Sequence, residues 1–512
     1  MTIPNPILPG FHPDPSIVRV GKDYFIATST FEWFPGVRIY HSQDLANWKL
    51  IAEPLNRKSQ LDMRGVPDSC GVWAPCLSYD NGVFYLVYSN VKTFHGPWLD
   101  TPNYLVTSEN ITGEWSEPIF LNASGFDGSL FHDDDGRKWY TSMLVDNRNS
   151  KFFGGIILQE YDPKESRLVG DSNLIFEGTS IGKTEGPHIY KKDGYYYLIT
   201  AEGGTEYGHA ISLARSKKIT GPYEVAPNNP LLTSWNDPKH PLQKTGHGDL
   251  VETEEGKWYL TYLTGRPLKE RGRCILGRET AIERVEWKDG WLYPCSNLKK
   301  AEVRTEPSKK STFYDFKTEV SRDFQTLREP RDESWITSNK KEGLQLIGRN
   351  SLSSLFDQSL LARRIQSYKA EVSLKMTFSP SNFQQMAGLL FYYNTQHYHY
   401  FHLRGSEHGF HELVLITNNK HQVTEEIVGQ TTSKSVILKG ILDRDTITFS
   451  YQQDELLKDG ATVDASILSD DYVLDGHIYH PAFTGMMVGF ACQDLTGTRL
   501  PAVFEWFDYK EF

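Results

Sequence analysis

The sequence predicts an all-β protein with an N-terminal five-bladed β-propeller and a C-terminal β-sandwich. Three observations carry this prediction: an internal repeat, a high aromatic content, and strand-like alternation after the repeat stops. Aromatic residues make up 13% of the 512 residues, and they favour strands and offer flat faces to ring-shaped ligands. A chain of this length exceeds what one hydrophobic core usually supports, which predicts two domains.

Five segments share one pattern of a small or Pro-containing start, an aliphatic residue, a Gly turn and an aromatic-rich strand. Two short apolar strands around such a turn predict a β-hairpin. The copies recur about every 60 residues, the length of one propeller blade. A β-sandwich with accidental similarity is the alternative. The five copies start at Asp14, Ala74, Asp127, Gly186 and His247, and their turns contain Gly21, Gly82, Gly136, Gly194 and Gly256.

The repeat also predicts where a site would form. The innermost strand of each blade starts near the propeller axis, so residues at equivalent positions meet at one mouth. The predicted mouth therefore gathers three carboxylates, a Trp and a His. These residues are Asp14, Trp73 with Ala74, Asp127, Glu185 with Gly186, and His247.

The predicted propeller spans residues 1–300 and the predicted sandwich residues 312–512. The charged stretch 299–311 is interpreted as the connection between them. Strand-like runs follow at 370–374, 387–391, 446–449 and 487–490, with the spacing of a sandwich. Such a domain either binds carbohydrate or walls and rigidifies the propeller, and the second interpretation is favoured because the sequence offers no evident aromatic platform.

Charge and composition exclude several classes of partner. The net charge is −11 and basic residues form no stripe, which argues against nucleic acid. No stretch reaches the 18 or more apolar residues of a membrane span. Residues 1–6 lack the features of a secretory signal, and the five cysteines have no metal-ligand spacing. We therefore expect a cytoplasmic protein with reduced thiols.

The carboxylates suggest glycosidic bond cleavage, which needs one protonated carboxyl group and one ionised carboxylate. Asp14 and Glu185 lie on blades one and four, facing each other across the axis. Asp127, on blade three, would raise the pKa of Glu185 through its negative charge. Taken singly, Asp14 and Asp127 are ordinary turn residues. Their shared position in the repeat favours a catalytic role.

Four further residues are candidates for the pocket. Phe31 and Trp73 would supply apolar walls for a sugar ring, although a lone Trp is more often part of a core. His247 would bind substrate, orient a carboxylate, help hold a metal ion or water, or have a purely structural role. Arg278 would bind a hydroxyl or tune a carboxylate, and a surface salt bridge is its alternative.

The motifs, taken in order, resemble glycoside hydrolase family 43, in its two-domain branch of β-xylosidases and α-L-arabinofuranosidases, along essentially the whole chain. The resemblance implies an inverting mechanism with Asp14 as general base, Glu185 as general acid and Asp127 as modulator of the acid. The motifs that carry it are Pro13-Asp14-Pro15-Ser16, Ser29-Thr30-Phe31-Glu32-Trp33, Gly71-Val72-Trp73-Ala74-Pro75, Gly125-Phe126-Asp127, Thr184-Glu185-Gly186-Pro187-His188 and Thr200-Ala201-Glu202-Gly203-Gly204-Thr205.

The resemblance further implies substrate contacts from Phe31, Trp73, His247 and Arg278, and from Phe483, which the sandwich would project into the pocket. A closed pocket favours release of terminal sugars, here β-D-xylose from short xylo-oligosaccharides. Arabinosides are alternative substrates, and a homo-oligomer (dimer or tetramer) is expected. A sugar-binding propeller without activity is a remote alternative. No metal is required, and the sequence leaves open whether Ca²⁺ occupies the axial channel.

Two departures from the family pattern concern the pocket. The chain has Val145 in Met143-Leu144-Val145-Asp146, where relatives usually have an aromatic residue. The segment 264–272 looks shorter than its counterparts. Either change would widen the pocket or alter subunit contacts, so the preferred sugar stays open.

Overall fold

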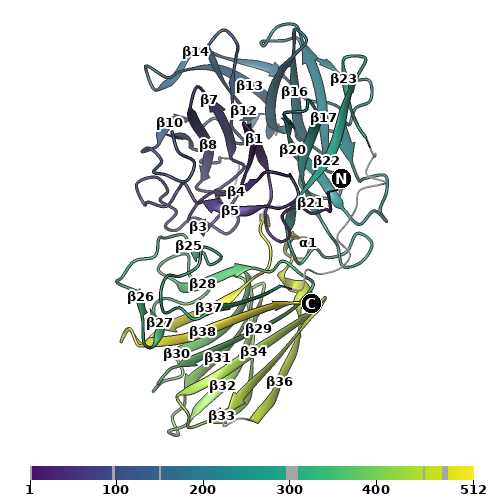
Figure 1. The fold of residues 1–512 in the computed structure, drawn as a ribbon. Coiled ribbons are helices and arrows are strands. Elements are labelled where there is room, and N and C mark those ends of the chain that lie inside the picture. Colours follow the sequence, from purple (N-terminus) through teal and green to yellow (C-terminus); the bar gives the residue numbers. More distant parts are fainter. Residues whose placement is uncertain (1–2, 95–97, 149–150, 296–309, 454–455, 475–481) are drawn as a thin grey trace. The chain divides into compact units, whose positions relative to one another are not determined.

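A computed structural model describes residues 3–94, 98–148, 151–295, 310–453, 456–474 and 482–512. The chain divides into two compact units, of which the first comprises Met1–Arg271 with Arg278–Arg304 and the second Gly272–Gly277 with Thr305–Phe512. In Figure 1 the strands of the first unit run from purple to teal and those of the second from green to yellow. The short segment Gly272–Gly277 thus belongs with the second unit, whereas the sequence analysis placed it in the first.

The first unit consists of five antiparallel sheets, one for each copy of the repeat, and the predicted five blades are confirmed. Blade one contains β1 (Ser16–Val20), β2 (Asp23–Thr28), β4 (Arg38–Ser42) and β5 (Lys49–Ala52). Blade two contains β6 (Gly71–Val72), β7 (Cys76–Asp80), β8 (Val83–Val91), β9 (Asn103–Ser108) and β10 (Ile119–Asn122). Blade three contains β11 (Ser129–His132), β12 (Lys138–Val145), β13 (Phe153–Asp162) and β14 (Arg167–Phe176).

Blade four contains β15 (Glu185–Lys192), β16 (Tyr195–Glu202), β17 (Ala210–Ser216), β18 (Glu224–Val225) and β19 (Leu232–Thr233). Blade five contains β20 (Gln243–Glu252), β21 (Trp258–Gly265), β22 (Arg278–Lys288) and β23 (Trp291–Pro294). In every blade the first two long strands form the predicted hairpin. Its turn glycine has a positive φ, as at Gly21 (60°) and Gly82 (86°), a conformation that other residues adopt only at a cost.

The N-terminal segment closes the ring of blades by pairing with β22 of blade five. The side chain of Asn5 exchanges two hydrogen bonds with the backbone of Ile282, and Leu8 forms a β-bridge with Thr280. Apolar side chains of blades one and five pack together at this seam, where their burial favours closure. The buried cluster contains Ile7, Leu8, Ile17, Tyr24, Ile26, Tyr40, Leu45, Val251 and Ile282.

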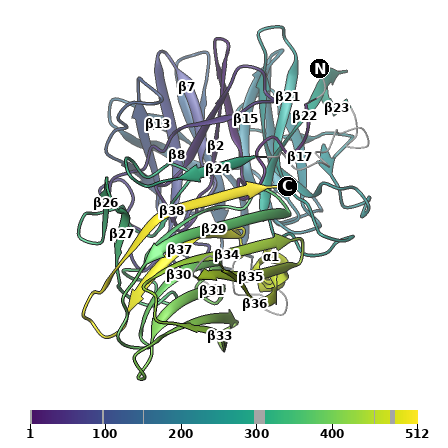
Figure 2. The ribbon, with the colours of Figure 1, turned by 60° about the horizontal axis from the view of Figure 1, so that its bottom comes forward.

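The second unit is a sandwich of two antiparallel sheets, which Figure 2 shows through β29, β34 and β38 of one sheet and β30, β31 and β37 of the other. Rings from both sheets meet in its core, such as Phe391 with Phe449. One sheet contains β24 (Ser311–Tyr314), β26 (Ile336–Asn339), β27 (Gly343–Ile347), β29 (Lys369–Thr377), β34 (Ser435–Asp443), β35 (Thr446–Gln453), β36 (Leu456–Asp464) and β38 (Pro501–Glu511). The other contains β28 (Ser359–Arg364), β30 (Gln385–Asn394), β31 (His397–Gly405), β32 (His411–Asn419), β33 (Gln422–Thr431) and β37 (Met487–Asp494).

The remaining elements are short. They are the strands β3 (Trp33–Phe34) and β25 (Thr326–Leu327), the 3₁₀ helix η2 (Ala465–Leu468) and the helix α1 (Asp470–Leu474). Residues 299–309 of the predicted connection lie outside the described residues. Among the described residues, no helix has the length and apolar character needed to cross a membrane.

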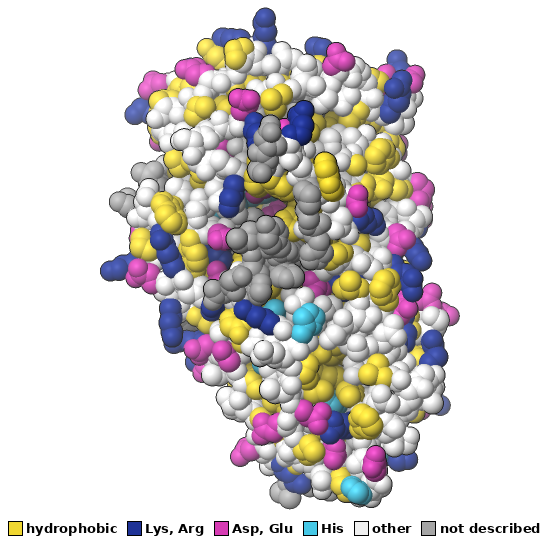
Figure 3. All heavy atoms as spheres, turned by 180° about the vertical axis from the view of Figure 1, so that it is seen from behind, with side chains coloured by type: hydrophobic (Ala, Val, Ile, Leu, Met, Phe, Trp, Pro, Cys, Tyr) yellow, Lys and Arg dark blue, Asp and Glu magenta, His cyan; other side chains and the backbone are white. Residues whose placement is uncertain are grey.

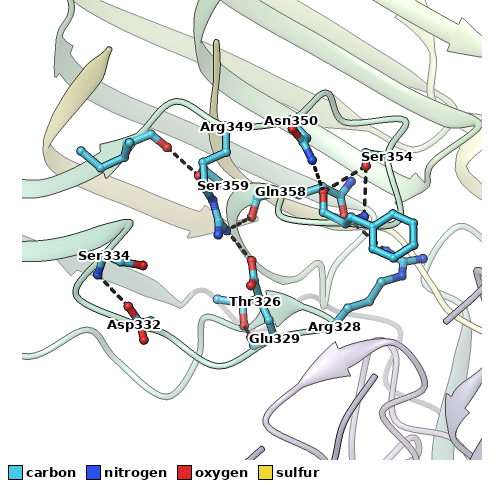
Figure 4. A network of polar contacts seen from close by, with 12 residues as sticks. Thr326, Arg328, Glu329, Asp332, Ser334, Arg349, Asn350, Ser354, Gln358 and Ser359 are labelled. Atoms are coloured by element: carbon cyan, nitrogen blue, oxygen red, sulfur yellow. Dashed lines mark hydrogen bonds and ion pairs between the residues drawn. The ribbon is translucent and has the colours of Figure 1, made fainter. Parts of the chain in front are cut away.

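A partly buried arginine holds together the loops beside β28. Arg349 donates to Glu329, to the carbonyl oxygen of Gln358 at 2.6 Å and to Ser359 Oγ at 2.9 Å (Figure 4). These three acceptors compensate the guanidinium for the water that it loses on partial burial. We refer to Arg349, Glu329, Gln358 and Ser359 as the Arg349 network.

Candidate active site

Four of the five starts of the repeat, all but Ala74, have a left-handed backbone conformation. Asp14, Asp127 and His247 have φ values of 54°, 56° and 44°, and the equivalent Gly186 has 56°. Residues with a side chain adopt this left-handed conformation rarely, and it concentrates at functional sites. The strain therefore marks the same positions that the repeat predicts to form the mouth.

Asp14 is buried at the entrance to β1, and both of its carboxylate oxygens have donors. Ser29 Oγ donates to Oδ2 at 2.5 Å, and Arg278 Nη1 donates to Oδ1 at 3.3 Å. These two contacts fix the carboxylate in one orientation. A carboxylate held in this way can take a proton from a bound water.

Glu185 begins β15 and is also buried. Burial and, after it, the negative charge of Asp14 raise its pKa to about 8, against the opposing effect of the positive charges of Arg278 and Lys183. The carboxyl group therefore carries its proton at neutral pH and can donate it. The sequence analysis named the charge of Asp127 as the cause of the raised pKa, whereas the largest cause in the structure is burial.

Asp127 connects the two sides of the site. Its pKa is raised well above the usual range by burial first, then by the charges of Glu185 and Asp14. The backbone N–H of Gly186 donates to its carboxylate and opposes this rise. Asp127 thus contacts the residue that follows Glu185, and the charge of Glu185 is one cause of its raised pKa.

His247 lies between two of the carboxylates. Its Nδ1 is 3.9 Å from Asp14 Oδ1 and 4.0 Å from Asp127 Oδ2, too far for hydrogen bonds. Burial lowers its pKa to about 4, so the ring is neutral at physiological pH. The ring also packs on Gly186, where an added Cβ would lie 2.9 Å from His247 Cε1.

Arg278 starts β22 and is 2% exposed, so the surface salt bridge proposed as its alternative is wrong. Its guanidinium lies 5.4 Å from the centroid of the Phe31 ring and donates to Asp14. It is the buried counter-charge of the three carboxyl groups. Phe31 also has a left-handed φ of 51°.

Phe31 and Trp73 come from neighbouring backbone segments. Phe31 exchanges backbone hydrogen bonds of 2.9 and 3.0 Å with Val72, which precedes Trp73. Trp73 Nε1 donates to Ser69 O at 2.9 Å, and its ring contacts Phe126 edge-to-face at 4.9 Å. Because Phe126 precedes Asp127, these aromatic rings flank the carboxylates on the side of blades one to three, as an apolar wall for a sugar would.

Comparison with known proteins agrees with this geometry. Residues 3–292 match the family described as glycosyl hydrolases family 43. The chain belongs to glycosyl hydrolase family 43. Residues 314–510 match a second family, the β-xylosidase C-terminal concanavalin A-like domain, which confirms a propeller followed by a sandwich.

Relatives of this family 43 chain match it along nearly its whole length. It is 48% identical to xylosidase/arabinosidase 43B of Humicola insolens over 99% of this chain and 97% of that protein. It is 47% identical to a β-xylosidase of Bacillus subtilis, with 100% of both chains covered. A crystal structure of xylan β-1,4-xylosidase from Bacillus halodurans C-125 matches with a TM-score of 0.94 and 50% identity, covering 99% of this chain and 100% of that one.

Phe483 belongs to the second unit of this glycosidase, in residues 482–486 that lead into β37. Its predicted place in the pocket stays a prediction. Val145 ends β12, where it pairs with Phe153 and donates its N–H to Ser124 O at 2.9 Å. Val145 thus stands at a strand end on blade three, at the position where the sequence analysis expects an aromatic residue in relatives.

Asp249, a buried residue of β20, is a further carboxylate near the mouth that was not among the predicted site residues. Its Oδ2 accepts from Ser16 Oγ at 2.9 Å and from Ile17 N at 2.8 Å, and its Oδ1 accepts from Tyr190 OH at 2.5 Å. These donors occupy both oxygens, so this carboxylate does not fit as a ready ligand for Ca²⁺, which takes six to eight oxygens. We derive no step through a metal.

Sequence reasoning also missed Ser29, Glu202 and Glu279. Ser29 and Glu202 lie within motifs that resemble the family. Membership of these motifs could have indicated that both residues belong near the site. Glu279 follows Arg278 directly. Nothing in the local sequence indicates that Glu202 and Glu279 are both fully buried, at 0% exposure.

Proposed function

We propose that the protein is an inverting, exo-acting glycosidase that releases terminal β-D-xylose from short xylo-oligosaccharides. The observation that carries this proposal is the pairing of a donor-anchored carboxylate, Asp14, with a buried carboxyl group of raised pKa, Glu185, at the mouth of the propeller. Hydrolysis of a glycosidic bond requires this pair of protonation states.

In the proposed mechanism, Asp14 takes a proton from a water while that water attacks the anomeric carbon. Glu185 donates its proton to the glycosidic oxygen as the bond to the leaving sugar breaks. Asp127 assists through the hydrogen bond from Gly186 N and through the electrostatic interaction between its carboxyl group and that of Glu185. Inversion predicts that the carboxyl groups of base and acid are about 6.5–9.5 Å apart, which leaves room for the water.

The names of relatives support xylose as the sugar. Besides the B. subtilis protein, a Vibrio protein that is 43% identical over 100% of this chain and 99% of its own length is named xylan 1,3-β-xylosidase. Relatives therefore include enzymes named for different linkages. We infer β-1,4-linked xylobiose as the first substrate to test and β-1,3-linked xylobiose as the comparison.

Proton NMR of the first-formed sugar tests the mechanism. Inversion of a β-xyloside releases α-xylose before mutarotation, and first release of β-xylose would rule out direct attack by water. Glu185→Gln tests the acid, since it should slow xylobiose hydrolysis by about 10²- to 10⁴-fold. It should slow 2,4-dinitrophenyl β-xyloside much less, because this leaving group departs without protonation.

A second candidate activity is α-L-arabinofuranosidase, alone or together with xylosidase. It is favoured by the name of the Humicola relative and by a Bacteroides ovatus relative, 32% identical over 99% of this chain, named non-reducing end α-L-arabinofuranosidase BoGH43B. The kcat/KM values on 4-nitrophenyl β-D-xyloside and α-L-arabinofuranoside decide between them. Val145→Trp would show whether the strand end of blade three sets this ratio.

We propose that the reaction requires no metal, since the acid and base are complete without one. Activity should survive dialysis against EDTA, and a loss reversed by Ca²⁺ would contradict the proposal. A cytoplasmic location and a dimer or tetramer stay predictions, the second to be tested by sedimentation. The expected exclusion of nucleic acid rests on charge, and on the face in Figure 3 basic side chains are scattered among acidic ones.

A further inference from the structure

Two fully buried carboxylates lie beside the proposed acid and base without belonging to either. Glu202 ends β16, next to Ala201, whose backbone pairs with Glu185. Glu279 follows Arg278 in β22. Both are 0% exposed, and a buried carboxylate is retained only where donors surround it.

Glu202 accepts four hydrogen bonds from three residues. Thr184 Oγ1 and Thr179 N donate to Oε1, both at 2.7 Å. Ser212 Oγ donates to Oε2 at 2.5 Å, and Thr179 Oγ1 donates to the same oxygen. The carboxylate thus ties the segment 179–184, which enters β15, to the neighbouring strand β17.

The packing around these contacts leaves no room for the segment to shift. A Cβ on Gly178 would lie 1.9 Å from Thr184 Oγ1 and 3.0 Å from Glu202 Oε1. The backbone N–H of Gly203 donates to Gly182 O at 2.8 Å. Thr184 directly precedes Glu185, so the hydroxyl bound by Glu202 lies one residue from the proposed acid.

Glu279 lies near the proposed base, Asp14, as Glu202 lies near the proposed acid. Arg266 Nε and Nη2 donate to its two oxygens at 2.6 and 2.8 Å. Gly10 N donates to Oε1 at 2.8 Å, in the segment that leads to Asp14. Glu279 therefore supports the side of the proposed base, through Gly10 and through its neighbour Arg278.

We propose that Glu202 is a positioning residue for the general acid Glu185, acting through the hydroxyl group of Thr184. This inference rests on the proposed role of Glu185. A misplacement of about 1 Å can cost about 10²-fold in rate, so the hydrogen bond from Thr184 affects proton donation without touching the substrate. Glu279 acts in the same way on the base side.

Two substrates with different leaving groups distinguish an effect on the proposed acid from an effect on the proposed base. Xylobiose needs the proton of the acid, whereas 2,4-dinitrophenyl β-xyloside does not, and both need the base and its water. Thr184→Val removes the hydroxyl and keeps the shape of the side chain. We expect kcat on xylobiose to fall by about 10- to 100-fold and kcat on the dinitrophenyl xyloside to fall less than about threefold, with KM unchanged for both.

Three further variants keep the inference open to refutation if Thr184→Val folds poorly. Thr184→Ser retains the hydroxyl and should restore xylobiose hydrolysis. Glu202→Ala removes all four contacts and should show the same leaving-group selectivity, whereas Glu279→Gln should slow both substrates equally. Equal loss on both substrates in Thr184→Val or Glu202→Ala would overturn the inference and leave a purely structural role.

Glu185→Gln serves as the reference that separates this inference from the proposed function. If it slows xylobiose far more than the dinitrophenyl xyloside, Glu185 is the acid, and the Thr184 and Glu202 variants then test positioning alone. If it slows both equally, the proposed function itself fails. Circular dichroism of each variant confirms that the fold is intact.

Discussion

The mouth of the propeller is buried and the Arg349 network of the sandwich is partly buried. Both contain charged groups, but the charges are balanced differently. In the network, Arg349 meets the acceptors of Glu329, Gln358 and Ser359. In the mouth, three carboxyl groups share one buried cation, Arg278. A satisfied network stabilises a fold, whereas an excess of like charge destabilises it and shifts pKa values.

The mouth combines this excess with left-handed backbone at Asp14, Asp127 and His247. Unfavourable backbone conformations and unfavourable electrostatics thus occur together in the mouth. Such a combination is typical of a functional site. The four residues of the Arg349 network have no left-handed φ, and the charge of Arg349 is paired with Glu329. Substitutions in the mouth should therefore lower activity more than stability, and substitutions in the network the reverse.

The largest effect is expected for Asp14→Asn. The attacking water loses its base, so kcat should fall by about 10²- to 10⁴-fold on activated and unactivated xylosides alike. The free energy of unfolding, measured in urea, should stay equal or rise, because the negative charge that raises the pKa values of the buried Glu185 and Asp127 is removed. A variant that keeps a tenth of the wild-type kcat would show that Asp14 is not the base.

Gly186→Ala should lower kcat by about 10- to 100-fold, because its Cβ would displace the His247 ring. The left-handed φ of 56° adds strain of about 1 kcal/mol. Gly194→Ala is the matched control, since Gly194 has a φ of 74° and no atom within 4 Å of an added Cβ. The control should lose similar stability and keep full activity; equal losses of activity would remove His247 from the explanation.

Arg349→Met should lower the free energy of unfolding by about 1–3 kcal/mol, the cost of hydrogen bonds to charged groups. Its kcat per folded molecule should equal that of the wild type. Urea denaturation combined with initial rates measures both quantities. A loss of kcat at full folding would mean that the sandwich contributes to catalysis through this network.

The smallest effect is expected for Lys183→Met. The positive charge of Lys183 lowers the pKa of Glu185, and its removal raises that pKa. Since the acid must be protonated, kcat/KM falls as pH rises through about 8, and this basic limb should move upward by a few tenths of a unit, about the strength of an exposed ion pair. Lys183→Arg should leave the limb in place, and salt should reduce the difference.

The repeat made the blades and the mouth predictable, because a fixed period places equivalent residues at equivalent points. It brought Asp127 and His247 together although 120 residues separate them in the sequence. Arg278 lies outside the repeat, so its candidacy left a surface salt bridge open as the alternative, and its burial was not predictable from the sequence. The cause of the raised pKa of Glu185 was also misjudged, since burial is a property of the whole mouth rather than of one neighbour.

Contacts between side chains that are distant in the sequence could not be predicted from local patterns. Nothing near Thr184 indicates that Glu202 binds its hydroxyl, and nothing near Gly10 indicates Glu279. The pairing of Asn5 with Ile282 closes the ring across nearly 280 residues, with no local pattern that names the partner. The grouping of Gly272–Gly277 with the second unit is likewise a tertiary feature.

The closure of the ring has a consequence for the chain as it leaves the ribosome. The segment before Asp14 is anchored to β22 by His12 N, which donates to Arg278 O at 2.9 Å, and by Thr280 Oγ1, which donates to His12 O at 2.6 Å. A nascent chain that ends after blade four already contains all three carboxylates, but lacks the strand that anchors the segment before Asp14. Asp14 is synthesised before the other two carboxylates, and it reaches its final environment only when blade five is complete.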